Sequence, residues 1–293
     1  MKFKSNVKVT QEAPVNFEDL MQDMDNVLNM ELEEAVEHLE DLTILEQNIS
    51  KYGVTEPVMH LVGGTLESWS IDISNKEVCL EGIGDKLKEA GKKVWETIVK
   101  IFKKIREYIK GFMSKFGKDK LTELEKDAKD VKMDPGADNA AGLIPSKYID
   151  KIFKVARSMD RHAKGPVDWD ELEPTLFEKN EAGVLDLAKK FLDEINVDDL
   201  SSKGYTDLAA MVKAQVTIAD SVDLFEKTAG FCEREAGRQL KASQSEYASP
   251  INERLRNEYT ELCKVINKLT SVCTKSIRVC NAIYRAEAAK ATK

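Results

Sequence analysis

Three histidines, His38, His60 and His162, have the broadest chemistry in this 293-residue chain, because a histidine can bind a metal ion or act as a base. Two zinc ligands on one helix face stand three or four residues apart, and no second histidine or cysteine lies at that distance from any of the three. The serines lack the Gly-x-Ser-x-Gly turn that exposes a nucleophile. The sequence therefore predicts no metal site and no cofactor, and it supports no catalytic residue.

Other patterns with chemical potential are better interpreted as structure. Residues 82–84 read Gly-Ile-Gly before a lysine-rich helix, but a phosphate loop also needs a further glycine, a Gly-Lys-Ser/Thr segment and a preceding strand. The carboxylates of residues 31–41 lack the Asp-x-Asn-x-Asp-Gly loop that binds calcium, so we interpret them as a solvated helix face. The five cysteines form no Cys-x-x-Cys pair, which predicts free thiols packed as small hydrophobic side chains.

The clearest element is an amphipathic helix predicted from Ile83 to about Phe116. At about 100° per residue, one face is apolar and carries Val94, Trp95, Ile98, Ile101, Phe102, Ile105, Tyr108, Ile109, Phe112, Met113 and Phe116. The opposite face carries the cations Lys92, Lys93, Lys100, Lys103, Lys104, Arg106 and Lys110, interrupted by Glu96 and Glu107. A positioned row of cations can contact an anionic partner, so this helix is the main candidate for function.

Several roles fit this helix, and the sequence leaves them open. The apolar face could form the core of a bundle, with the lysines in water. It could instead lie in a membrane interface or in a groove on a partner protein, with Trp95, Phe102 and Phe112 in contact. The seven cations could also bind DNA without sequence preference, because cations at helical spacing neutralise several phosphates together.

The formal charge of the chain changes sign at Glu81. Residues 1–81 hold 17 acidic and five basic residues, a balance of −12, whereas residues 82–293 hold 35 acidic and 39 basic residues, a balance of +4. An acidic segment attached to a mildly basic body predicts that this segment masks, or competes with, an anionic partner of the body. Its removal would take the net charge from −8 to +4.

Hydrophobic periodicity predicts an all-α protein, with amphipathic N-terminal helices followed by a helical bundle built on a long antiparallel helical hairpin. The hairpin turns at Ser249-Pro250, and Thr206 is the expected N-cap of its first helix. The second helix has a heptad seam formed by Leu255, Leu262, Leu269, Ser276 and Ile283 together with Tyr259, Ile266, Cys273 and Cys280. We divide the chain into an acidic leader (1–81), a basic amphipathic helix with a hinge (82–142) and a C-terminal bundle (143–293).

Two segments before the basic helix share one form: Gly64-Thr65-Leu66-Glu67-Ser68 and Val78-Cys79-Leu80-Glu81-Gly82. Each resembles the sites at which prohead proteases of large tailed bacteriophages cut after a glutamate. An acidic leader, a Leu-Glu junction and a basic amphipathic helix together are similar to the layout of internal head proteins of these phages, over about residues 1–120. The resemblance implies cleavage after Glu81 or Glu67, assembly in the host cytoplasm and a final place in the phage head. It also implies phage head or core proteins and a prohead protease as partners.

We therefore expect a non-enzymatic internal or structural virion protein, packaged in the head of a large tailed phage and associated with its DNA or ejected with it. The alternative is a membrane-active or partner-docking helical protein, and a third hypothesis is an enzyme with a dispersed active site in the C-terminal bundle. No small-molecule substrate is evident. No stretch approaches the roughly 18 apolar residues of a membrane span, and no secretory signal begins the chain, so we expect a soluble protein made in a cytosol.

Overall fold

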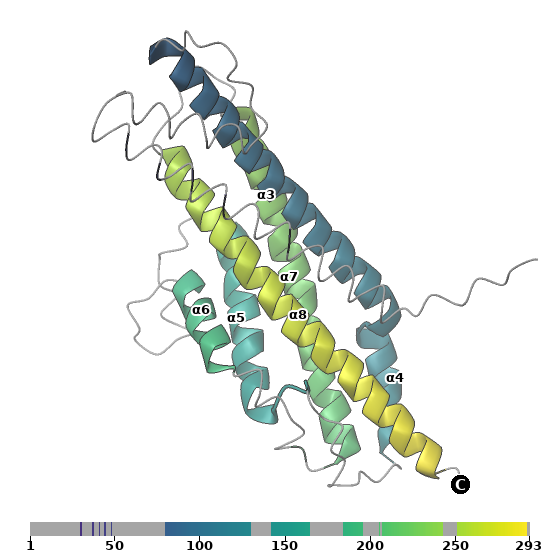
Figure 1. Cartoon of the computed structure of the whole chain (residues 1–293). Helices are drawn as coiled ribbons and strands as arrows, with labels where there is room; N and C mark the ends of the chain where they lie inside the picture. Colours follow the sequence, from purple (N-terminus) through teal and green to yellow (C-terminus); the bar gives the residue numbers. More distant parts are fainter. Residues whose placement is uncertain are drawn as a thin grey trace, which may run out of the picture.

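The computed structural model describes residues 80–129, 142–164, 184–195, 205, 207–242 and 251–291, together with positions 30, 37, 41, 44 and 48 of the leader (Figure 1). Its helices are α3 (Leu80–Phe116), α4 (Lys118–Ala128), α5 (Ser146–Lys164), α6 (Val184–Glu194), α7 (Leu208–Ala242) and α8 (Ile251–Ala291). The secondary structure of these residues is helical apart from short turns and connections, and none of them lies in a strand, which confirms the predicted all-α class. Among them, no helix combines the length and the apolar character needed to cross a membrane.

Helix α7 lies at the centre of the bundle and packs against α3, α4, α5 and α8, while α6 packs against α5 and α8 (Figure 1). Helices α7 and α8 run in opposite directions side by side, as the predicted hairpin requires. The first of them is capped by Asp207 rather than by the expected Thr206, because the Asp207 carboxylate accepts the backbone N–H of Ala210 at 2.7 Å. Every described position of the heptad seam on α8 is buried.

The apolar face of α3 supplies much of the core. Nine of its predicted apolar residues, from Val94 to Phe112, are buried, and they share one core with side chains of α5, α7 and α8. The ring of Tyr259 on α8 contacts Trp95 and Phe102 edge to face, with centroids 5.8 Å and 6.1 Å apart. The expected boundary at residues 142 and 143 therefore does not separate two cores, because α3 and the C-terminal helices bury each other's apolar surface.

Helix α3 ends at Phe116, where its apolar pattern predicted the end. Gly117 has an extended backbone and separates α3 from α4. A Cβ atom at this position would lie 2.3 Å from the carbonyl oxygen of Met113, so the tight corner requires glycine. The corner lets α4 fold against α7 and bury Leu121 and Ala128.

The end of the predicted hinge is held in the bundle by hydrogen bonds between buried groups. Ser276 occupies a polar position in the apolar seam, where its hydroxyl donates to Gln215 Oε1 and accepts the N–H of Ile144, both at 2.9 Å. The hydroxyl of Tyr205 donates to the carbonyl of Ile144 at 2.6 Å. Residues 142–145 are buried, so this stretch is a docked connection rather than an exposed hinge.

The cysteines that the structure describes behave as the sequence predicted. Cys232, Cys263, Cys273 and Cys280 are free and buried. Burial raises the pKa of all four thiols, to about 12 for Cys280, because the apolar surroundings disfavour the thiolate. They therefore pack as small hydrophobic side chains, and Cys79 lies outside the described residues.

Replacement of Phe102 by alanine should test how far the bundle depends on α3. The side chain is fully buried between helices, so we expect Phe102→Ala to lower the free energy of unfolding by about 3–5 kcal/mol. Lys100→Ala, on the exposed face of the same helix, should change it by less than about 0.5 kcal/mol. Urea denaturation followed by circular dichroism measures both, and equal effects would contradict the assignment of Phe102 to the core.

Candidate functional site: the charged face of helix α3

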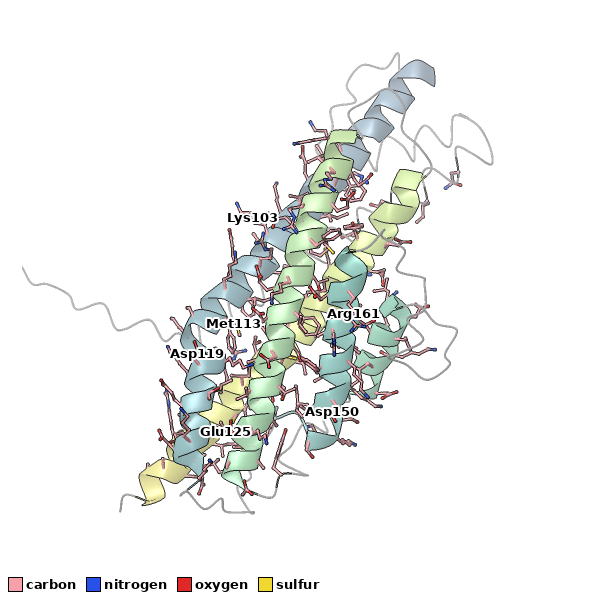
Figure 2. All side chains as sticks on the ribbon, turned by 180° about the vertical axis from the view of Figure 1, so that it is seen from behind. Lys103, Met113, Asp119, Glu125, Asp150 and Arg161 are labelled. Carbon is pink, nitrogen blue, oxygen red and sulfur yellow. The ribbon has the colours of Figure 1, made fainter. Side chains whose placement is uncertain are left out.

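The predicted cations of α3 differ in exposure because the packing on α7 and α8 sets the rotation of the helix. Lys100, Lys103 and Lys110 are exposed. Lys92, Lys93, Lys104 and Arg106 are partly buried beside neighbouring side chains. Seen from behind, α3 with Lys103 and α5 with Arg161 lie on opposite sides of α7 (Figure 2). The row that the sequence predicted as one surface is therefore divided between solvent and the contact with α7.

Arg106 forms a clasp between α3 and α7. Its Nε lies 3.0 Å from Glu226 Oε1, and one of its terminal nitrogens lies 2.5 Å from Glu233 Oε2. The hydrogen bond to Glu233 raises the pKa of Arg106, and the contacts with Glu226 add to this effect against the opposing effect of burial. Because two carboxylates already bind its guanidinium, Arg106 joins α3 to α7, and the predicted contact with a phosphate would require both pairs to break.

Gly230 explains how Arg106 reaches both carboxylates. This glycine lies between Glu226 and Glu233 on α7, and a Cβ atom there would stand 2.8 Å from Arg106 Nε. Glycine inside a helix costs about 1 kcal/mol relative to alanine, so the position needs a structural reason. Here the reason is the close passage of the arginine side chain, beside a small pocket that Asp160 and Ala163 of α5 also line.

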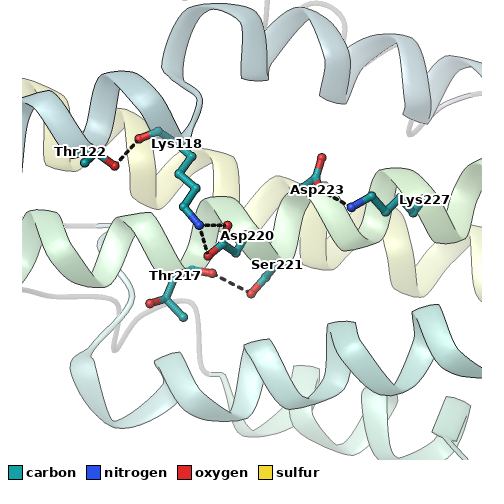
Figure 3. Close-up of polar contacts among 7 residues, drawn as sticks. All are labelled: Lys118, Thr122, Thr217, Asp220, Ser221, Asp223 and Lys227. Atoms are coloured by element: carbon teal, nitrogen blue, oxygen red, sulfur yellow. Dashed lines mark hydrogen bonds and ion pairs between the residues drawn. The ribbon is translucent and has the colours of Figure 1, made fainter.

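Two further cations, one on α3 and one on α4, meet acidic residues of α7. Lys110 Nζ lies 3.6 Å from Glu226, and Lys118 Nζ contacts both oxygens of Asp220 at 2.8 Å and 3.0 Å (Figure 3). Glu226 and Glu233 stand seven residues apart, close to two helical turns, so they lie on one face of α7, whereas Asp220 is displaced from Glu226 by about 120° around the helix. Sequence reasoning missed these carboxylates, because nothing in the sequence assigns them to α3 and α4.

The other predicted cations of α3 have weaker contacts or none. Lys92 pairs with Glu96 at 3.7 Å and Lys103 with Glu107 at 3.9 Å, both one turn apart on the same helix and exposed to solvent. Such pairs contribute little to stability. Lys100 is exposed and forms no ion pair with the residues that the structure describes. Fewer cations on this face are therefore available to bind an anionic partner than the sequence predicted.

The expected membrane or partner face of α3 is part of the core. Trp95, Phe102 and Phe112 have at most 1% of their surface exposed. Phe112 also stacks on Phe116 with ring centroids 5.1 Å apart. Helices α7 and α8 cover these three side chains, so the predicted contact with a membrane or a partner would require the bundle to open.

The predicted cleavage sites lie at the edge of the described structure. Helix α3 begins at Leu80 rather than at the predicted Ile83, which places Glu81 in its first turn. Glu67, His38, His60 and the side chain of His162 lie outside the described residues. Within the part of the chain that is described, no three histidine, cysteine or acidic side chains gather as metal ligands would.

These features define a class: a helical structural protein in which Arg106 and Lys110 join α3 to α7, with an acidic leader before this bundle in the sequence. A family model described as phiKZ-like phage internal head proteins matches residues 12–162, just over half of the chain. The chain belongs to this family. The match includes both the acidic leader and α3, confirms the resemblance drawn from the sequence and locates the protein inside the phage head. Searches of curated proteins and of solved structures returned no match.

A double-mutant cycle on the clasp should separate it from the exposed pairs. We expect Arg106→Ala and Glu233→Ala to couple by about 1–2 kcal/mol in the free energy of unfolding, because a charge-assisted hydrogen bond between partly buried groups is lost. The control cycle with Lys103→Ala and Glu107→Ala should give at most about 0.5 kcal/mol. Urea denaturation measures both, and equal coupling would show that the clasp is an ordinary surface pair.

Proposed function

We propose that this protein enters the prohead with its acidic leader attached, and that a prohead protease removes residues 1–81 during maturation. The body, residues 82–293, then stays in the head as a structural protein associated with the packaged DNA. Family membership supports the location in the head. The change of charge at Glu81 and the Leu-Glu-Gly sequence at the same place support the cleavage.

The observation that carries this proposal is the position of the core. Every described core residue lies at or beyond Val94. In the leader, the described hydrophobic residues Met30 and Ile44 are 68% and 51% exposed. Cleavage after Glu81 would therefore remove no described core residue, so the body can keep its fold without the leader.

The position of Glu81 in a helix is compatible with cleavage. A protease binds an extended chain, so the first turn of α3 must open. The first four N–H groups of a helix have no partner within it, so opening this turn breaks few hydrogen bonds. The N-terminal end of α3 extends beyond the ends of α7 and α8 (Figure 1), and the described buried side chains of α3 begin only at Val94. Local opening at Glu81 leaves the core contacts in place.

The electrostatic effect of cleavage favours association with DNA. The full chain carries a net charge of −8 and is repelled by phosphate, whereas the body carries +4. Packaging with the leader attached would delay contact with DNA until the head matures. The membrane-active alternative loses its main support, because Trp95, Phe102 and Phe112 are buried. Nothing in the described residues favours the enzyme hypothesis.

The N-terminus of the protein in virions tests the cleavage. Intact-mass measurement and N-terminal sequencing of protein extracted from purified phage should find chains that begin at Gly82, or at Ser68 if Glu67 is the site used. Protein made alone in a heterologous host is the control and should begin at the initiator methionine. Virion protein that starts only at Met1 would refute the proposed maturation.

The leader's effect on DNA affinity tests the second part of the proposal. A chain of residues 82–293 should bind random-sequence duplex DNA more tightly than the full chain at low salt, because the leader's balance of −12 no longer opposes binding. Affinity should fall as salt rises, since binding releases counterions. Fluorescence anisotropy measures both, after circular dichroism has checked that the shorter chain melts cooperatively. Equal affinities would mean that the leader does not regulate contact with DNA.

A further inference from the structure

Helix α5 carries a row of cations that the sequence analysis did not single out. Its members are Lys147, Lys151, Lys154, Arg157 and Arg161, here called the α5 stripe, and all five are exposed. They follow at spacings of four, three, three and four residues, so they fall within about 120° of the helix circumference and span about 21 Å along it. Asp150 is the exposed acidic residue within this arc.

The core fixes the direction in which the stripe faces. The opposite side of α5 is apolar and buried, and it carries Ile149, Ile152, Val155, Ala156, Met159 and Ala163. These side chains pack in the same core as α7 and α8. Because rotation of α5 would expose them, the cations are held pointing away from the bundle. Figure 2 shows Asp150 and Arg161 at the two ends of this helix.

Lys147, Lys151, Lys154 and Arg157 of the stripe are more available than Arg106 and Lys110 of α3. Lys154 and Arg157 form no ion pair with any residue that the structure describes. Lys147 lies over the ring of Tyr148, 4.7 Å from its centroid, and so keeps its charge unneutralised. Lys151 pairs with Glu194 at 2.6 Å, but both side chains are more than half exposed, and such a pair is weak enough for a phosphate to replace.

We propose that the α5 stripe is the surface through which this protein contacts the phosphate backbone of packaged double-stranded DNA. This inference rests on the proposed association with DNA and names its contact residues, in place of the α3 cations that the sequence predicted. A row of lysine and arginine side chains contacts phosphates without reading bases. Lipid is the less suitable partner, because the exposed large hydrophobic residues of the described chain, Met30 and Ile44, both lie in the leader.

Two matched double variants of the full chain test the proposal. Lys154→Gln with Arg157→Gln removes two charges from the stripe, and Lys100→Gln with Lys103→Gln removes two exposed charges from α3. Binding to random-sequence duplex DNA is measured against salt concentration. The stripe variant should lower the slope of log affinity against log salt by about 1.8, because each phosphate contact contributes about 0.9, while the α3 variant keeps the wild-type slope.

Other results would overturn the assignment. If the α3 variant lowers the slope as much as the stripe variant does, the loss of affinity comes from net charge and not from the position of the cations. If neither the full chain nor residues 82–293 bind DNA at low salt, or if the stripe binds anionic vesicles or polyglutamate instead, DNA is excluded as the partner. The N-terminus of the protein in virions tests the proposed cleavage by a separate measurement. A wrong assignment of the DNA contact to the stripe can therefore be told apart from a wrong assignment of the cleavage. Unchanged circular dichroism of both variants excludes misfolding.

Discussion

The structure depends on one constraint: the broad apolar face of α3 must be covered, and among the described helices the two long ones, α7 and α8, cover most of it. Trp95, Ile98, Phe102 and Phe112 are too large to remain in water without a considerable loss of stability. Their burial makes α3 part of the same core as the C-terminal hairpin. It also sets the rotation of α3, and this rotation brings Arg106 towards the acidic face of α7.

Because of that rotation, some charged side chains of α3 form ion pairs with α7. Arg106 and Lys110, with Lys118 of α4, meet Glu233, Glu226 and Asp220 along α7. An arginine held by two carboxylates would lose both contacts by turning to a phosphate, whereas an exposed lysine loses almost nothing. The exposure and pairing of the cations, more than their number, therefore decide which face of the bundle can contact DNA. On these grounds α5 is a better candidate for the proposed DNA contact than α3.

The proposed maturation agrees with the described structure. The described hydrophobic residues of the leader are exposed, and the described core residues begin at Val94. The proposed cleavage would change the sign of the protein's charge without removing any described core residue. The family match extends from residue 12 in the leader to residue 162 in α5, so it includes the junction, α3 and the α5 stripe.

Periodicity along the sequence determined which face of each helix is apolar, because that pattern is local. The core positions of α3, the described seam from Tyr259 to Ile283 on α8 and the buried free cysteines follow from it. Tertiary structure decided the contacts between residues distant in sequence. Arg106 meets Glu233 across 127 residues, and packing of α5 on α7 and α6 aims the α5 stripe outward. Spacing reveals that a helix has a charged face, but only the packed bundle decides whether that face meets water or another helix.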